Sequence, residues 1–396
     1  MHIEETSLSA ESIRYDSMLA KFKSLKYSSG THSPSISILS KNFPELSSDI
    51  IDFCFLSNPY ASDLFLNQLK EDIKQDSVLE KLIAHYLSQN TQIANYIGCA
   101  IGCDPNKIFV GNGAIEAIQA VIQNFCGKSM VIPLPTFSSY YEFVPNKFNT
   151  IFYIKNKLDH FLLNKGHFVD FVKKSAADSV VLINPNNPDG SYIPFGDLEM
   201  IVDELSYLSC IIIDESFIHF AYEDESLLPI MHQSLVDKYP NVVVIKSMSK
   251  DFGVAGVRAG YAIMTADRVK QLIGNGYLWN SNQFSEYFFE LFSRAEFRST
   301  YEVVRKKYIG DIRCFYQELQ KIKNIVVYPS MANFILIELK TISAEELTLK
   351  LFVQYAVYVR NCNDKKGLSG EFIRLAVGKE TQNNYLIRAI NKLVNG

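Results

Sequence analysis

Several features are scarce in this chain of 396 residues, and each scarcity narrows the class of protein. No apolar run approaches the roughly 18 residues that a membrane-spanning helix needs, so we expect no membrane segment. The net charge is −4 and no basic run stands out, so we expect no nucleic-acid partner. The first residues lack the basic and apolar regions of a signal peptide, so we expect a cytoplasmic protein.

The cysteines also argue against a metal or disulfide framework. There are seven, and they are scattered. Cys99 and Cys103 form the nearest pair, but no histidine or second pair completes a zinc pattern, so we expect no metal site.

What the chain does have is aromatic residues. Its 27 phenylalanines and 22 tyrosines favour a well-buried core and a subunit interface.

The order of the apolar runs predicts an α/β fold. From about 55 to 275, short apolar runs alternate with helical stretches, which is typical of a largely parallel sheet covered by helices. The predicted strands are 108–110, 130–133, 151–154, 180–183, 210–213, 242–246 and 260–264. After about 285 the pattern changes to a long helix (286–320), strands at 325–328, 333–338, 357–360 and 372–377, and a closing amphipathic helix (380–394).

One stretch, residues 247–260, sets a lysine among hydroxyl residues and glycines, directly after an apolar run. The amine of Lys250 can form a Schiff base with an aldehyde cofactor. The hydroxyls of Ser247 and Ser249 and the guanidinium of Arg258 can hold a phosphate. An aldehyde and a phosphate on one cofactor indicate pyridoxal phosphate (PLP). The alternative is a surface lysine in a glycine-rich loop.

Three polar residues follow predicted strands and so fall at one edge of the sheet, where ligands bind in such folds. They are Asn187, Asp214 and Lys250. Upstream, residues 111–118 read as a glycine-rich turn that opens a helix. Taken in order with Phe372–Val377, these signals resemble the fold-type I PLP enzymes, the aspartate aminotransferase superfamily, over residues 50 to 396. The resemblance implies a large PLP-binding domain over 51–285, a small C-terminal domain over 286–396, and an N-terminal segment, 1–50, packed on the small domain.

The resemblance also implies roles for individual residues. Asp214 faces the pyridine nitrogen and keeps the ring protonated, so that the ring accepts electrons. Asn187 hydrogen-bonds the ring hydroxyl, Phe137 stacks on the ring, and Lys250 moves a proton at the substrate carbon. Each residue has a plainer alternative: a loop cap for Asp214, turn chemistry for Asn187 and core packing for Phe137.

A second group of residues suits the cofactor phosphate. The backbone N–H groups of Gly113, Ala114 and Ile115 lie at a predicted helix N-terminus, which binds anions readily. In relatives, a tyrosine in an Arg-Tyr-Pro segment reaches the phosphate across a homodimer. Tyr86 stands at the matching distance, although His85 and Leu87 replace the arginine and proline. A helix-face tyrosine is the alternative.

Within the superfamily, the chain resembles the histidinol-phosphate aminotransferase and threonine-phosphate decarboxylase branch. The resemblance lies in residues 214–220, 328–334 and the arginine pair Arg360 and Arg374, and it implies a phosphorylated substrate. Two arginines suit a doubly anionic molecule. We expect Arg374 to bind the carboxylate, and Arg360, with His32, to bind the phosphate. An interdomain ion pair for Arg360 and a non-ligand histidine at His32 are the alternatives.

Two reactions remain open, and we expect the first. A PLP-dependent aminotransferase follows if Arg374 holds the substrate carboxylate in the ring plane, so that the Cα–H bond breaks. A PLP-dependent decarboxylase of a phosphorylated amino acid follows if the arginines hold only the phosphate. Phe217, where many aminotransferases carry tyrosine, favours the decarboxylase, because phenylalanine cannot donate a hydrogen bond to the ring oxygen. A non-enzymatic PLP-binding module is a third hypothesis.

Overall fold

The computed structural model describes residues 17–28, 33–144, 148–224 and 231–396. The chain forms two compact units. The larger unit comprises Leu56–Ile312 and Pro329–Asn333, and the smaller one comprises Met1–Phe55, Arg313–Tyr328 and Phe334–Gly396. The domain division at 285 stays a prediction, and residue 285 lies inside helix α12 (Gln283–Ser293).

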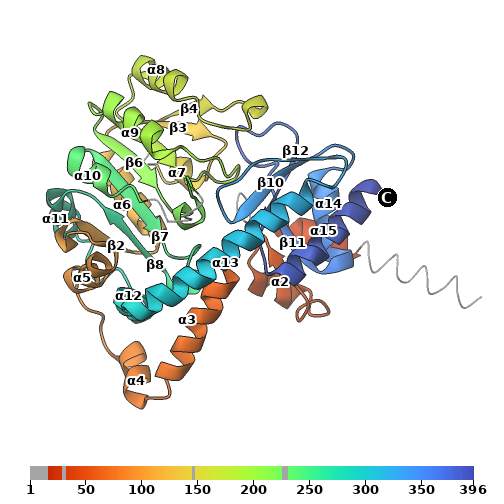
Figure 1. The fold of residues 1–396 in the computed structure, drawn as a ribbon, viewed down its shortest axis with the longest axis horizontal. Helices are drawn as coiled ribbons and strands as arrows, with labels where there is room; N and C mark the ends of the chain where they lie inside the picture. The colour runs from red at the N-terminus through yellow and green to blue at the C-terminus, as the bar shows by residue number, and fades with distance from the viewer. Residues whose placement is uncertain (1–16, 29–32, 145–147, 225–230) are drawn as a thin grey trace, which may run out of the picture. The chain divides into compact units, whose positions relative to one another are not determined.

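A seven-stranded sheet in the order β2-β8-β7-β6-β5-β3-β4 forms the centre of the larger unit (Figure 1). Its strands are β2 (Ile108–Asn112), β3 (Ser129–Leu134), β4 (Asn149–Ile154), β5 (Ser179–Ile183), β6 (Cys210–Asp214), β7 (Val242–Ser247) and β8 (Ala259–Ile263). β8 is antiparallel to both β2 and β7, while the other neighbours are parallel. The predicted α/β fold with a largely parallel sheet is confirmed.

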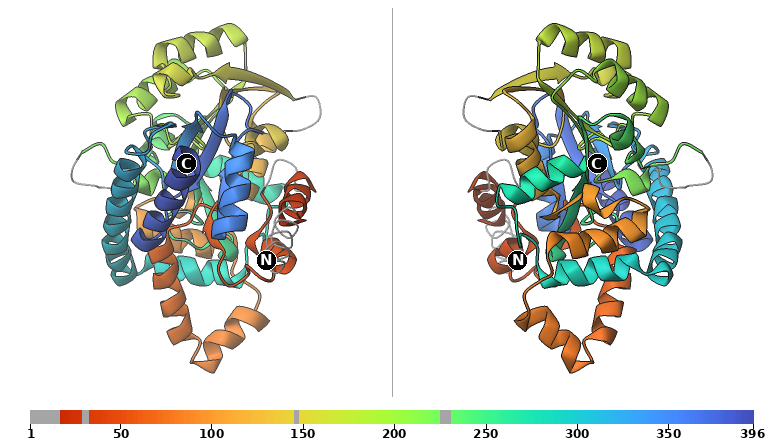
Figure 2. Two further views of the ribbon diagram at one scale, coloured as in Figure 1. Left: turned by 90° about the vertical axis from the view of Figure 1, so that its right-hand side faces the viewer. Right: turned by 90° about the vertical axis from the view of Figure 1, so that its left-hand side faces the viewer.

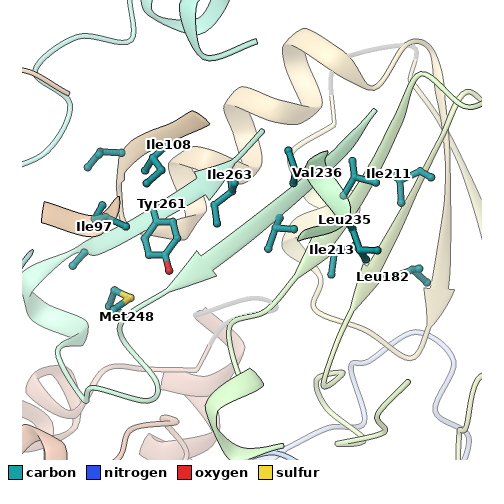
Figure 3. Close-up of a cluster of buried hydrophobic side chains, with 14 of the residues drawn as sticks. Ile97, Ile108, Leu182, Ile211, Ile213, Leu235, Val236, Met248, Tyr261 and Ile263 are labelled. Atoms are coloured by element: carbon teal, nitrogen blue, oxygen red, sulfur yellow. The ribbon is translucent and has the colours of Figure 1, made fainter. Parts of the chain in front are cut away.

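The sheet is covered on both faces, which explains why its strands are continuously apolar. In β7, Val242 and Val244 belong to the cluster on one face, and Val243 and Ile245 to the cluster on the other. Figure 3 shows the first cluster. The helices that contribute to this cluster are α3 (Pro59–Asp72), α4 (Asp76–Ala84), α5 (Asn90–Ile101), α8 (Lys165–Ser175), α9 (Phe195–Glu204), α10 (Ser234–Lys238), α12 and α13 (Ala295–Leu319). Helices α6 (Ala114–Phe125), α7 (Ser139–Glu142) and α11 (Ala266–Gly274) pack into the second cluster.

The prediction of a single long helix over 286–320 is wrong. This part of the chain forms two helices, α12 and α13 (Ala295–Leu319), separated at Arg294. The backbone of Arg294 is extended, with φ −79° and ψ 129°, so the helical hydrogen-bond series is interrupted there. The apolar periodicity runs through both helices and therefore did not mark the break. Among the described residues, no helix combines the length and apolar character needed to cross a bilayer.

The smaller unit is built on a five-stranded sheet in the order β1-β11-β12-β10-β9. Its strands are β1 (Ile51–Phe53), β9 (Ile325–Val327), β10 (Phe334–Leu339), β11 (Val357–Asn361) and β12 (Glu371–Ala376). Helices α14 (Ala344–Tyr355) and α15 (Glu380–Asn395) lie side by side (Figure 2). The described part of the N-terminal segment, helical residues 17–28 and α2 (Ile36–Asn42), packs on this unit, because Phe22 stacks on Phe352 with ring centroids 4.2 Å apart.

Candidate functional site

A cavity lies in the larger unit, and residues that follow β5, β6 and β7 help to line it. Its volume is about 160 Å³, several times the roughly 30 Å³ that one water molecule occupies in the liquid. It can therefore hold a small organic molecule. The cavity is lined by Ala114, Ile115, Ile118, Phe137, Ile183, Asn187, Asp214, Ser216, Phe217, Ser247, Ser249, Lys250 and Arg258. Nine of the residues predicted to bind the cofactor thus lie around one space.

One end of the cavity is suited to an anion. Helix α6 begins here, and its first N–H groups have no partner within the helix. Gly113 caps it with φ 76°, and a Cβ on Gly113 would lie 2.5 Å from Nη2 of Arg258. A Cβ on Gly260 of β8 would lie 2.3 Å from the backbone nitrogen of Ala114. Neither position has room for a Cβ, so both residues must be glycine. Their small size lets the guanidinium and the helix N-terminus lie close together.

Arg258 itself has an unusual backbone. Its φ of 62° is left-handed, a conformation that costs a side-chain-bearing residue about 1–3 kcal/mol. Its Nη1 donates to the carbonyl oxygen of Ala255 at 3.0 Å. Strain of this kind persists where the surrounding structure fixes it, most often at functional sites. With Ser247 and Ser249 on the same cavity wall, the arrangement offers a guanidinium, two hydroxyls and backbone N–H groups to a phosphate.

Asp214, at the end of β6, supplies the acidic side of the cavity. Its Oδ1 accepts from the backbone N–H of Ser216 at 2.9 Å, and its Oδ2 accepts from the hydroxyl of Tyr140 at 2.8 Å. Burial raises the pKa of the Asp214 carboxyl, while these two hydrogen bonds and the positive charge of Lys246 act in the opposite direction. A protonated ring nitrogen placed against this carboxylate would add a further opposing charge.

Tyr140 is a site residue whose role the sequence did not reveal. Its hydroxyl is committed to Asp214 and its side chain is buried, so it is not available to stack on a ring in the cavity. Phe137 is the aromatic residue that lines the cavity. The signal was present in part, because Tyr140 lies one helical turn after Phe137, at the start of α7. The partner was not visible, since Asp214 is 74 residues away.

Two loops that reach the cavity are joined by a buried polar network. Asn186 donates from Nδ2 to the carbonyl oxygen of Pro135 at 2.9 Å and to Oδ2 of Asp189 at 2.7 Å. The same Oδ2 pairs with Nζ of Lys155 at 2.5 Å. Asn186 and Asp189 thus connect the loop that carries Asn187 to the loop that carries Phe137.

Four described residues predicted at the site are not among those that line the cavity. Gly113 is the N-cap of α6, next to the lining residue Ala114. Tyr86 is 94% exposed, and its role across a dimer stays a prediction. Arg360 and Arg374 belong to the smaller unit. His32 lies outside the described residues. Conversely, the cavity is also lined by Ile118, Ile183 and Ser216, which were not predicted as site residues.

In the smaller unit, Arg360 and Arg374 are direct partners across the antiparallel strands β11 and β12. Such partners share a face of the sheet, with Cβ atoms about 4.5–5.5 Å apart. Arg360 bonds Asp364 at 2.5 Å, and Arg374 donates from Nη2 to the carbonyl oxygen of Cys54 at 2.8 Å. Burial and the charge of Arg360 lower the pKa of Lys26. This face of the small sheet is therefore strongly cationic, although both arginines are nearly buried.

The cavity in the larger unit has the features that PLP requires. A lysine, a phosphate site at a helix N-terminus and a buried carboxylate all border a space large enough for a small molecule. Phosphate donors at one position and an acidic partner at another match a cofactor with a phosphate and a basic ring nitrogen. Together with the sheet order, they define the class of fold-type I PLP enzymes.

Comparison with known proteins agrees with that class. The model of the family "Aminotransferase class I and II" matches residues 53–390, so the chain belongs to this family and its cofactor is PLP. The chain is 50% identical over 371 residues to an L-serine phosphate decarboxylase of Campylobacter jejuni, covering 93% of this chain and 95% of that protein.

Two further relatives place the chain within the family. The structure of a decarboxylase from Sulfurospirillum multivorans has a TM-score of 0.91 and 40% identity and covers 98% of both chains. A histidinol-phosphate aminotransferase of Caldanaerobacter subterraneus is 30% identical over 329 residues, covering 82% of this chain and 85% of that protein. The chain is therefore similar to enzymes of both reaction types, but more closely to decarboxylases.

Proposed function

We propose that this protein is a PLP-dependent decarboxylase of a phosphorylated amino acid, with L-serine phosphate as its substrate. The observation that carries this proposal is the 50% identity to an L-serine phosphate decarboxylase over nearly the whole of both chains. Our expectation from the sequence was transamination, with decarboxylation as the alternative. The comparisons favour the alternative, because the aminotransferase relative is only 30% identical.

The residues around the cavity have separate tasks in this proposal. Bound PLP supplies a ring that accepts the electrons released when a bond at the substrate Cα breaks. Lys250 would hold the cofactor and would later deliver a proton to the substrate Cα. Asp214 and Asn187 would be partners for the ring nitrogen and ring hydroxyl, and Phe137 would pack against the ring. Ser247, Ser249, Arg258 and the backbone N–H groups of Gly113, Ala114 and Ile115 would hold the phosphate.

A doubly charged phosphate on the substrate explains the arginine pair. L-Serine phosphate carries a carboxylate and a phosphate, and Arg360 and Arg374 are neighbours on adjacent strands. We propose that both arginines hold the phosphate, and His32 stays a further proposal for the same group. The carboxylate is then left without a fixed partner and can depart as carbon dioxide. Phe217, which lines the cavity without a hydroxyl, is consistent with this chemistry.

We further propose a homodimer. Three apolar side chains on or just after α4 are exposed: Leu79 at 42%, Ile83 at 72% and Tyr86 at 94%. Exposed apolar side chains that gather on one segment are typical of an interface. Sedimentation equilibrium of the purified protein tests the oligomeric state, and an active monomer would contradict both the dimer and a cross-subunit role for Tyr86.

The test of the reaction uses purified protein loaded with PLP and given L-serine phosphate without any oxo acid. Decarboxylation gives carbon dioxide and phosphoethanolamine in amounts far above the enzyme concentration. L-Threonine phosphate, and histidinol phosphate with 2-oxoglutarate, serve as competing substrates. Lys250→Ala is the control and should remove turnover. Turnover of histidinol phosphate in preference to L-serine phosphate would overturn the proposal in favour of transamination.

A further inference from the structure

A buried ion pair lies directly beside the proposed attachment lysine. Lys246 of β7 pairs with the carboxylate of Asp251, and their side chains are only 1% and 0% exposed. Nζ of Lys246 also donates to the carbonyl oxygen of Glu215 at 3.2 Å. Side chains alternate along a strand, so Lys246 lies on the face of Val242 and Val244, opposite the cavity-lining Ser247. The pair therefore lies behind the wall that carries Lys250.

The other titratable groups near this pair do not replace Asp251 as the counterion of Lys246. Nδ1 of His219 lies 3.2 Å from Oδ2 of Asp251 and 2.8 Å from the hydroxyl of Tyr301. Burial, Lys246 and Arg305 lower the pKa of His219 well below its ordinary range, so the imidazole is neutral. Arg305 donates to the carbonyl oxygen of His219 at 2.8 Å and pairs with Glu302. Across the sheet, Asp214 also feels the positive charge of Lys246.

Stability alone does not explain this ion pair. Taking two charges out of water costs several kcal/mol per ion, and packed apolar side chains in their place are often as stable or more so. The location is informative instead, because Asp251 is the residue next to Lys250. Asp251 enters the interior on one side of the chain while Lys250 borders the cavity on the other.

The same turn is anchored at two further points. The backbone N–H of Asn58, the N-cap of α3, donates to the carbonyl oxygen of Lys250 at 2.8 Å. The hydroxyl of Ser62 donates to the carbonyl oxygen of Gly253 at 2.8 Å. Asp251 provides the charged anchor between these two. With the backbone fixed at and after Lys250, the lysine side chain has a restricted set of directions.

We propose that the Lys246–Asp251 ion pair is a positioning device that fixes the backbone of the 247–254 turn and so directs the amine of Lys250 into the cavity. The inference rests on the proposed function only in taking Lys250 as the lysine that holds PLP. It names Lys246 and Asp251 as positioning residues that act through Lys250 and do not touch substrate.

The test measures how fast the protein freed of PLP forms its link with added PLP, by the growth of the visible absorbance band. No substrate is present, so the result does not depend on which amino acid the enzyme uses. We expect Asp251→Asn to slow this step on the order of 10- to 100-fold, since small misplacements of reacting groups have effects of that size. The visible circular dichroism of the bound cofactor should change as well.

Two further variants separate positioning from folding. Asp178→Asn removes a carboxylate that anchors Lys128 and Ser129 before β3 and β5, remote in sequence from the turn. It should lower thermal stability without slowing the link. Lys246→Met combined with Asp251→Asn leaves no unpaired buried charge, so it should regain stability and still form the link slowly. If Asp251→Asn does not fold, the rate at which the double variant forms the link with PLP tests the inference instead.

Recovery of both stability and wild-type linking rate in the double variant would overturn the inference, because the pair would then serve the fold alone. Equal slowing by Asp178→Asn would overturn it too. A wild-type protein that links PLP normally but does not decarboxylate L-serine phosphate would refute the proposed function and leave this inference intact.

Discussion

The hydroxyl of Tyr140 donates a 2.8 Å hydrogen bond to Oδ2 of Asp214, and both side chains are buried. Burial and the neighbouring carboxylate raise the pKa of Tyr140 well above its ordinary value, so the phenol keeps its proton and always donates. Because the second carboxylate oxygen accepts from the backbone of Ser216, Asp214 is held from two sides. The acidic partner proposed for the ring nitrogen is thus oriented before any cofactor binds.

Tyr140→Phe removes one of these two constraints. A hydrogen bond to a charged group contributes about 1.5–3 kcal/mol, so we expect PLP to bind about tenfold or more weakly. Titration of the PLP-free protein with PLP, followed by absorbance, measures the Kd. Tyr277→Phe is the matched control, because it removes a hydroxyl that donates to Oε1 of Gln123 at 3.3 Å and does not line the cavity. Equal affinity in both variants would show that Tyr140 does not support the cofactor.

Phe217→Tyr adds a hydroxyl to the cavity wall. In the proposed arrangement this hydroxyl donates to the ring oxygen of PLP and stabilises the negative charge there. The link between Lys250 and PLP should then lose its proton more easily, and the pH midpoint of the visible band should fall by about one unit. A spectrophotometric pH titration measures this midpoint. An unchanged midpoint would place the Phe217 ring away from that oxygen.

Asp178→Asn tests a pH dependence of stability. Hydrogen bonds from the backbone of Lys128 and the hydroxyl of Ser129 lower the pKa of the Asp178 carboxyl in the folded protein. A depressed pKa means that the stabilisation is present above the unfolded-state pKa and is lost as the pH falls through the folded-state pKa. The variant should therefore be less stable than wild type at neutral pH, and the difference should shrink in acid. Urea unfolding at several pH values measures it, and a constant difference would contradict the assignment.

The Lys155–Asp189 pair gives a test of the network between the two loops. Both side chains are nearly inaccessible, with exposures of 3% and 0%. Asp189→Asn leaves a buried ammonium without its counterion, which should lower the free energy of unfolding by about 3–5 kcal/mol. Lys155→Met together with Asp189→Asn should recover much of that loss. A single-variant loss below about 1 kcal/mol in urea unfolding would show that the pair does not support the loops.

Local patterns predicted much of this fold. Runs such as 180–183 and 242–246 are apolar without interruption, and they form β5 and β7, which are buried on both faces. The residues that follow such strands, Asn187, Asp214 and Lys250, were predicted to share one edge, and all three line the cavity. Their chemical roles stay predictions. The family resemblance added Phe137, which no periodicity singles out.

Other features depend on contacts between distant residues and could not be predicted from the sequence. Asp189 looks like a turn residue until β4 brings Lys155 beside it. Lys246 looks like an ordinary charged residue at a strand end until Asp251 enters the interior. Strand β1 is only three residues long and owes its existence to parallel pairing with β11, 306 residues further on. Such pairings are tertiary, so local propensity carries no signal for them.

The most direct test of the account follows the carboxyl carbon of the substrate. Purified, PLP-loaded protein is given L-serine phosphate labelled with carbon-13 at the carboxyl carbon, and the products are analysed by mass spectrometry. The account predicts that the label leaves as carbon dioxide, that the phosphoethanolamine formed is unlabelled, and that turnover continues without an amino acceptor. Label retained in a phosphorylated oxo acid, formed once per enzyme with the cofactor left as pyridoxamine phosphate, would contradict it and identify an aminotransferase.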